Sequence, residues 1–204
     1  MRVITANARR ETVELLKTLI GIRSVNPPGE EDRVVEFIEG YLSELGIESR
    51  RVPLDPGRSS LVARIPGASD GSCVLCGHMD TVDTDSAKWT STDPFSPRID
   101  GGRLWGLGSA DMKSGVAVIL QTAKEIIRQG LTPPHDLVLA LTADEERAYR
   151  GAAAVATSGL IDDARFLLIT EPTGGSVYIG QKGELWVEAT FHGRAGHGSI
   201  PESG

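Results

Sequence analysis

Residues 74–85 read VLCGHMDTVDTD, and this stretch changes character at Gly77. An apolar run that predicts a buried strand ends at the glycine, and His78 and Asp80 come directly after it. Side chains at positions i and i+2 of an extended chain point the same way, so these two polar groups leave the strand together. The stretch therefore raises the question of which other residues meet His78 and Asp80 beyond the end of the strand.

Apolar strands and amphipathic helices alternate on both sides of this stretch. The helical spacing of apolar residues predicts helices at 11–22, 31–46, 112–130 and 150–159. Apolar runs predict strands at 47–52, 60–65, 73–77, 136–143 and 165–170. Strands that are apolar throughout and separated by helices are typical of parallel sheets buried on both faces. The sequence therefore predicts an α/β fold whose mainly parallel sheet carries helices on both faces.

The pattern changes after Glu171. Residues 176–183 and 184–193 alternate between apolar and polar side chains, which predicts a different, antiparallel sheet. We accordingly expect one domain at residues 1–181 and the start of a second at residues 182–204. The sequence ends in GHGSIPESG without a closing helix, so we expect it to be the N-terminal part of a longer protein.

Charge and apolar runs limit the partners of the protein. The 204 residues carry a formal charge of −7 and contain no cluster of lysine and arginine, so a nucleic-acid partner is not expected. The longest apolar runs, VAVIL and LVLAL, are far shorter than the roughly 20 residues that span a membrane. The first residues also lack the apolar core of a signal peptide. These features predict a cytoplasmic protein with no membrane partner.

Acidic and imidazole side chains cluster at the predicted strand ends. In an open α/β sheet, ligands bind beyond the carboxyl ends of the strands. The side chains at these ends, or just before the helix at 112–130, are His78, Asp80, Asp111, Asp144, Glu145, Glu146 and Glu171. So many carboxylates repel one another unless they are neutralised, and only Lys113 and Arg147 are close basic residues. Divalent metal ions therefore explain the cluster better. One imidazole with several carboxylates suits Zn²⁺, with Co²⁺ or Mn²⁺ as alternatives.

Roles within such a site follow from the spacing. A metal-bound imidazole usually donates its other N–H to a carboxylate, and Asp80 is placed to accept it from His78. Glu145 and Glu146 cannot point the same way in a turn, so one can bind metal while the other serves as general base. A P-loop is disfavoured because Met112 stands where its glycine is required, and the sequence contains neither HExxH nor GxSxG.

Five segments resemble, in order, the signatures of the M20 metallopeptidases: GHMDTV, GLGSADMKSG, TADEERAYRGA, TEPTG and GRAGHGSIPESG. That family includes acetylornithine deacetylase, succinyl-diaminopimelate desuccinylase, aminoacylase-1 and dimetal carboxypeptidases. The resemblance implies a zinc-aminopeptidase-like α/β domain followed by the start of an inserted α+β dimerisation, or lid, domain. It also implies a homodimer when the protein is full length.

The resemblance further implies two divalent metal ions, most often Zn²⁺. Carried over by position, His78 and Glu171 bind one metal, Glu146 binds the other, and Asp111 bridges the two. A final histidine ligand of the second metal lies beyond residue 204 in the family. We therefore expect residues 1–204 alone to be inactive.

The remaining catalytic roles are also implied by the resemblance. Asp80 orients His78, Glu145 is the general base, and His197 reaches the active site of the partner subunit. The peptide bond after Asp111 is expected to be cis. One departure is Leu107, where relatives often carry an arginine.

The expected activity is hydrolysis of an amide bond in an N-acyl amino acid or a short peptide, by a metal-bridging water that Glu145 activates. The alternative is a non-catalytic protein of the same fold that binds metal or a small acid. Loss of Glu145 would favour that alternative, and Glu145 is present.

Overall fold

The computed structural model describes residues 5–84, 89–90, 92–183, 185, 187–190 and 192–203. The chain forms two compact units, Met1–Pro172 and Thr173–Gly204. This division does not test the expected domains at residues 1–181 and 182–204, which stay a prediction.

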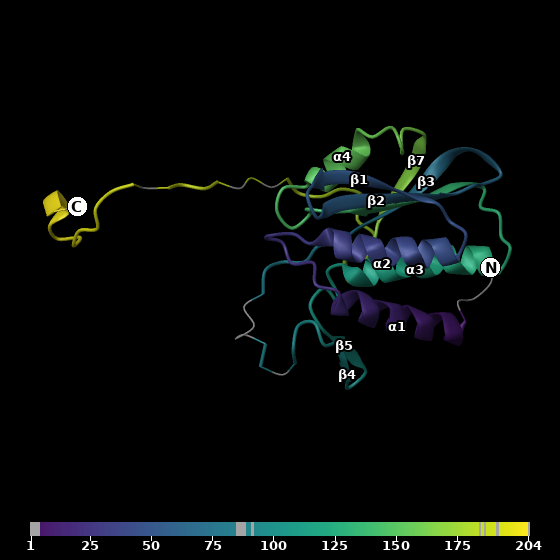
Figure 1. The fold of residues 1–204 in the computed structure, drawn as a ribbon, viewed down its shortest axis with the longest axis horizontal. Coiled ribbons are helices and arrows are strands. Elements are labelled where there is room, and N and C mark those ends of the chain that lie inside the picture. Colours follow the sequence, from purple (N-terminus) through teal and green to yellow (C-terminus); the bar gives the residue numbers. More distant parts are fainter. Residues whose placement is uncertain are drawn as a thin grey trace. The chain divides into compact units, whose positions relative to one another are not determined.

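A five-stranded sheet in the order β1–β2–β6–β3–β7 forms the frame of the first unit (Figure 1). The strands are β1 (Ser49–Asp55), β2 (Arg58–Ile65), β3 (Ser69–His78), β6 (His135–Thr142) and β7 (Ala164–Ile169). β3 pairs in parallel with β6 and β7, whereas β2 pairs antiparallel with β1 and β6. β2 therefore opposes the common direction of the other strands, and the predicted mainly parallel sheet is confirmed.

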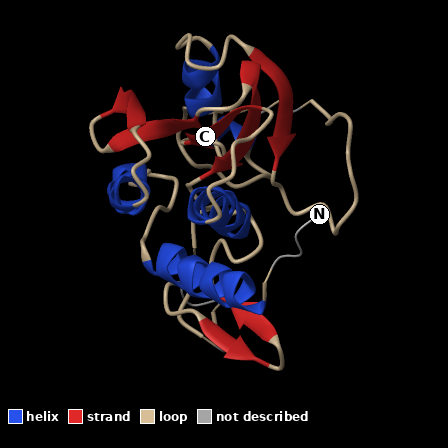
Figure 2. Cartoon of the chain, turned by 90° about the vertical axis from the view of Figure 1, so that its right-hand side faces the viewer, coloured by secondary structure: helices blue, strands red, loops and turns tan. Residues whose placement is uncertain are grey.

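Helices cover both faces of this sheet, as the sequence predicts. They are α1 (Ala6–Gly21), α2 (Glu31–Glu44), α3 (Lys113–Arg128) and α4 (Arg150–Ala156). α2 and α3 pack against one face and α4 packs against the other (Figures 1 and 2). α1 lies against α3, on the side that faces away from the sheet.

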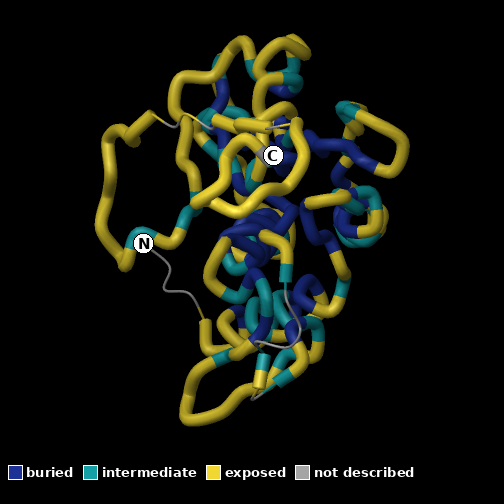
Figure 3. Tube along the Cα trace, turned by 90° about the vertical axis from the view of Figure 1, so that its left-hand side faces the viewer, coloured by how far each residue is buried: buried dark blue, intermediate teal, exposed yellow. Residues whose placement is uncertain are grey.

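The central strands fill two cores because successive strand side chains point to opposite faces. The core under α2 and α3 takes one set of sheet residues: Leu61, Ala63, Ile65, Leu137, Leu139 and Leu141. The core under α4 takes the residues that alternate with them: Val62, Val138 and Ala140. This two-sided burial is the physical reason that the central residues of β2 and β6, 61–63 and 137–141, are continuous apolar runs. Figure 3 shows the buried chain at the centre of the first unit, with exposed loops around it.

β7 differs from the predicted buried strand. Its side chains Phe166, Leu167 and Leu168 are 58%, 52% and 45% exposed. β7 is an edge strand that pairs only with β3 among the described strands. No described helix covers this edge of the sheet. The apolar side chains of β7 are therefore exposed.

Among its described residues, the second unit shows neither of the strands predicted at 176–183 and 184–193. Its described residues form one short 3-10 helix, Pro201–Ser203. Residues 184, 186 and 191 lie outside the described residues. A strand gains stability from hydrogen-bonded neighbours, and the described part of this unit supplies none.

A hairpin that the sequence analysis did not predict joins β4 (Arg98–Asp100) to β5 (Arg103–Trp105). Gly101 and Gly102 form its two-residue turn with φ of 56° and 75°, which glycine adopts without strain. The hairpin lies beside α1 on the side away from the sheet (Figures 1 and 2).

Gly115 lets the first turn of α3 approach the end of β7. A Cβ at this position would clash with the side chain and the carbonyl oxygen of Thr170. Gly115→Ala is therefore expected to lower the free energy of unfolding by about 1–3 kcal/mol, the usual cost of overpacking. Gly40→Ala is the control, because Gly40 is an exposed position of α2 with open space around its Cβ. That control should raise stability by about 0.5–1 kcal/mol. Denaturant unfolding measures both, and equal effects would contradict the close contact.

Candidate metal centre

The ends of neighbouring parallel strands place the predicted site residues at one edge of the sheet. β3 runs parallel to both β6 and β7, so the carboxyl ends of these strands lie on the same side. The predicted residues end or follow these strands, or directly precede α3: His78, Asp80, Asp111, Glu145, Glu146 and Glu171. The fold therefore explains how groups far apart in the sequence reach one place.

His78 lies at the centre of this group. Its Nε2 is 3.1 Å from an oxygen of Asp111. The same atom is 3.5 Å from Glu145 and 3.7 Å from Glu171. Two sets of side chains bring their ligand atoms within 4.8 Å of one another: His78, Asp111 and Glu146, and His78, Glu145 and Glu171. We call these five residues the ligand cluster. Both adjacent glutamates belong to it, so spacing alone does not separate a metal ligand from a general base.

The hydrogen bonds of His78 fix which nitrogen faces the cluster. Its Nδ1–H donates to the backbone carbonyl of Asp80 at 2.9 Å, while the Asp80 carboxylate lies 3.7 Å away. This bond leaves Nε2 as the ring nitrogen that faces the cluster. The Asp80 carboxylate instead accepts the backbone N–H groups of Glu145 and Glu146, each at 3.1 Å. The backbone of Asp80 thus contacts the imidazole, and its side chain contacts the following turn of the site.

Crowding and burial perturb the titration of the cluster. Burial alone would lower the pKa of His78, but the Asp111 hydrogen bond and the nearby carboxylates outweigh it and raise the pKa to about 9. Burial, together with the charges of Asp111 and Glu145, raises the pKa of Glu146 and of Glu171 to about 7. The hydrogen bond to His78 lowers the pKa of Asp111. Burial and neighbouring carboxylates thus disfavour the charged forms of Glu146 and Glu171, whereas the imidazole favours the charged form of Asp111.

The basic residues nearest in sequence do not neutralise the cluster. Lys113 Nζ donates to the carbonyl oxygens of Leu19 at 2.9 Å and Ile22 at 2.6 Å. Burial lowers the pKa of this lysine to about 7. Arg147 is exposed. One imidazole and several carboxylate oxygens within mutual reach form a donor set that fits a divalent ion of the Zn²⁺, Co²⁺ or Mn²⁺ type.

The loop before α3 presents Asp111 to the cluster. The Asp111–Met112 peptide bond is cis, as the resemblance implies. Leu107 is half-buried, and its N–H donates to the carbonyl oxygen of Pro94 at 2.8 Å. A backbone hydrogen bond to Pro94 therefore holds the loop at Leu107.

His197 belongs to the second unit and is exposed there. Its Nδ1 lies 2.8 Å from the hydroxyl of Ser199 and accepts the Ser199 backbone N–H at 3.3 Å. The Nε2 atom of His197 is thereby the nitrogen left for another partner. The expected role of His197 stays a prediction.

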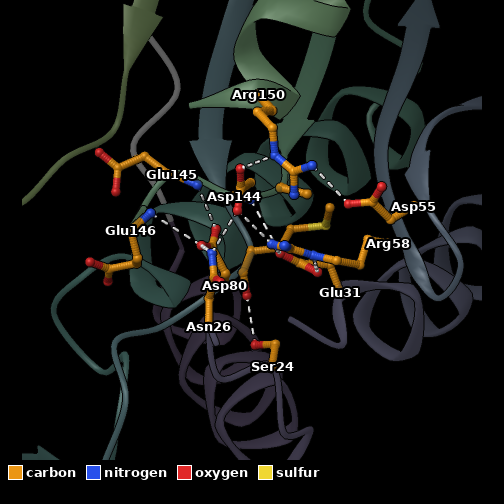
Figure 4. A network of polar contacts seen from close by, with 12 residues as sticks. Ser24, Asn26, Glu31, Asp55, Arg58, Asp80, Asp144, Glu145, Glu146 and Arg150 are labelled. Carbon is orange, nitrogen blue, oxygen red and sulfur yellow. Dashed lines mark hydrogen bonds and ion pairs between the residues drawn. The ribbon is translucent and has the colours of Figure 1, made fainter. Parts of the chain in front are cut away.

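Buried polar side chains behind the cluster were not singled out by the sequence analysis. They are Asn26, Glu31 and Arg58, and they contact Asp144 and Asp80 (Figure 4). Each is a single polar residue at a helix start, in a loop or at the start of a strand. No local pattern distinguishes them, because their partners are distant in sequence.

Comparison with known proteins matches residues 74–193 to the model of peptidase family M20/M25/M40. A probable succinyl-diaminopimelate desuccinylase of Staphylococcus aureus strain Mu50 is 31% identical over 97% of this chain and 49% of its own length. Acetylornithine deacetylase of Proteus mirabilis is 35% identical over 94% of this chain and 50% of its own length. The chain thus spans about half the length of the curated relatives it matches.

Solved structures share the fold at lower sequence identity. Human carnosine dipeptidase 1 aligns with 81% of this chain and 39% of its own, with a TM-score of 0.70 and 18% identity. The Bacillus subtilis YXEP protein, a dinuclear metal binding peptidase from the M20 family, aligns with 80% of this chain and 42% of its own, with a TM-score of 0.60 and 18% identity. Within the described residues, none of the helices combines the length and the apolar character that crossing a membrane requires.

Proposed function

The chain belongs to peptidase family M20/M25/M40, and on that premise we propose that the protein is a metal-dependent amidohydrolase. It cleaves the amide bond of an N-acyl amino acid or a short peptide. The observation that carries this proposal is the ligand cluster, in which one buried imidazole faces four carboxylates at the edge of a parallel sheet. Such a donor set suits metal-assisted hydrolysis.

An N-acyl amino acid is the first substrate class to test. The two curated relatives are named as a desuccinylase and a deacetylase, so both names describe removal of an acyl group. A short peptide is the second class, because the matching family model is one of peptidases. Both substrates contain the same secondary amide bond, so one mechanism serves either.

The metal ligands are assigned on the basis of family resemblance and distance. We propose that His78 and Glu171 hold one divalent ion, Glu146 holds a second, and Asp111 lies between them, with Zn²⁺ as the first choice. Bound metal would lower the pKa of a water molecule and polarise the substrate carbonyl.

Glu145 is proposed to move the proton in this reaction. It is half-buried, and one of its oxygens lies 3.5 Å from His78 Nε2, so it borders the place where a substrate carbonyl would sit. It takes a proton from the attacking water as the new C–O bond forms. It returns that proton to the leaving nitrogen as the C–N bond breaks. The products are a carboxylic acid and a free amine.

The rival function is binding without catalysis, in which the same side chains hold a metal or a small acid. The carboxylate of Glu145 supports catalysis instead, because a binding site for an acid would not place another negative group beside the ligands.

The adjacent glutamates provide the test of the proposed function. In the full-length protein, Glu145→Gln should abolish turnover of N-acetyl and N-succinyl amino acids and leave metal content nearly unchanged, because only the base is lost. Glu146→Gln should lower both turnover and metal content, because a ligand is lost. Metal analysis by mass spectrometry together with amine-release assays measures both. The reverse pattern would exchange the two roles, and turnover by Glu145→Gln at the wild-type rate would refute the mechanism.

His197 is proposed to donate a hydrogen bond to the substrate carbonyl oxygen across the interface of a homodimer. In the full-length protein, His197→Ala should lower kcat by about 10²–10³, the usual loss for one oxyanion donor. Metal content should not change. Mixed His197→Ala and Glu145→Gln subunits should regain, as heterodimers, activity well above that of either variant alone. No recovery after verified subunit exchange would exclude action across the interface.

A further inference from the structure

Arg58 lies behind the ligand cluster, at the start of β2, and has no place in the mechanism above. Resting on the proposed function, we propose that Arg58 is a positioning residue. Together with Glu31 and Asp144, it fixes the backbone turn that aims Glu145 and Glu146 at the reaction site (Figure 4).

The turn at residues 144–146 is held by carboxylates from other segments. The backbone N–H of Asp144 donates to Glu31 Oε1 at 3.2 Å. The next two N–H groups, those of Glu145 and Glu146, donate to the two oxygens of Asp80. Asp144 itself has a φ of 63°, a left-handed conformation that residues other than glycine adopt only rarely. Two buried acceptors, Glu31 and Asp80, thus fix the positions of three successive backbone N–H groups.

Arg58 fixes the first of these acceptors. Its guanidinium donates to both oxygens of Glu31, at 2.8 Å and 2.6 Å, and to Asp144 Oδ1 at 2.8 Å. The side chains of Arg58, Glu31 and Asp144 are 9%, 0% and 3% exposed. A planar guanidinium can hold one carboxylate with two bonds and still reach a second, which a lysine cannot do. Arg58 therefore sets the distance between Glu31 and Asp144.

Two further residues extend the network of Arg58, Glu31 and Asp144, one toward Asp80 and one toward the surface. Asn26 Nδ2 bridges Asp144 Oδ1 at 3.0 Å and Asp80 Oδ2 at 2.9 Å, so the network runs without a break from Glu31 to Asp80. Arg150 Nε donates to the other oxygen of Asp144 at 2.7 Å. Figure 4 shows these side chains converging on Asp144 from several segments.

The chain also makes room for the guanidinium. Gly29 has a φ of 84°, and a Cβ there would clash with the guanidinium of Arg58. A buried ion pair contributes little net stability compared with apolar residues of the same volume, because both charges lose their hydration. The stability of the fold therefore does not account for three charged groups buried here. Their shared contact with the turn at residues 144–146 accounts for the burial of these charged groups.

The test compares two arginines of β2 in the full-length, metal-loaded enzyme. Arg58→Lys keeps the charge and loses the two-bond contact with Glu31. It is expected to lower kcat by about 10–100-fold, the usual effect of removing a partner of a site residue, with KM nearly unchanged. Arg64→Lys is the control, because Arg64 also binds two carboxylates, Asp136 at 2.8 Å and Asp163 at 2.9 Å, near the other end of β2. Its kcat should stay at the wild-type value.

Hydrogen–deuterium exchange of the metal-free protein supplies a readout that needs no catalysis. Peptides that contain residues 144–146 should exchange faster in Arg58→Lys than in the wild type, and at the wild-type rate in Arg64→Lys. If the wild type hydrolyses no amide, the proposed function fails, and the exchange rates still decide whether Arg58 holds the turn.

Several results would overturn the proposal. They are unchanged exchange in Arg58→Lys, a kcat that stays at the wild-type value, and an equal loss of kcat in Arg64→Lys. If Arg58→Lys does not fold, Glu31→Gln replaces it, because the amide keeps the shape of the side chain and retains one acceptor. That variant should shift exchange and kcat in the same direction, and wild-type values for both would overturn the proposal.

Discussion

Repulsion among carboxylates at the ends of three parallel strands is the constraint on which the rest of the site depends. The ligand cluster gathers Asp111, Glu145, Glu146 and Glu171 around His78, and Asp80 and Asp144 lie buried behind it. Charges this close raise one another's free energy unless cations or hydrogen-bond donors compensate them. The structure meets this requirement differently for the two sets. We call Asp80 and Asp144 the inner carboxylates and the four of the ligand cluster the outer carboxylates.

The inner carboxylates are compensated by the protein itself. Asp144 is bound by Arg58, Arg150 and Asn26, and its pKa is lowered because these donors outweigh the effect of burial. Asp80 accepts backbone N–H groups from Glu145 and Glu146. These donors to the inner carboxylates therefore also restrain the turn that carries Glu145 and Glu146.

Among the outer carboxylates, Asp111, Glu145 and Glu171 lie 3.1 Å, 3.5 Å and 3.7 Å from Nε2 of His78. The pKa of Glu146 and of Glu171 is raised to about 7, first by burial and then by like charges. This contrast separates groups that the fold itself has neutralised from groups that a bound divalent ion would neutralise. It is the physical basis for proposing a metal centre here and a supporting network behind it.

Local patterns were sufficient to predict the frame of the fold. The helix expected at 112–130 is Lys113–Arg128, and the strand expected at 136–143 is His135–Thr142, because periodicity and apolar runs are local properties. The strand ends then brought His78 and Glu171 together. The network was not predictable, since Arg58 and Asp144 are 86 positions apart and Asn26 and Asp144 are 118 apart. The exposure of β7, and the absence of strands from the described residues of the second unit, depend on neighbouring elements, which single segments do not encode.

Anomalous diffraction at the zinc edge, from crystals of the full-length protein grown with Zn²⁺, tests the central claim most directly. Two peaks are expected, one beside His78 and Glu171 and one beside Glu146, with Asp111 between them. Each should lie about 2.0–2.2 Å from its nitrogen or oxygen ligands. Peaks elsewhere in the protein, or none within bonding distance of His78, would contradict the assignment of this cluster as a metal centre.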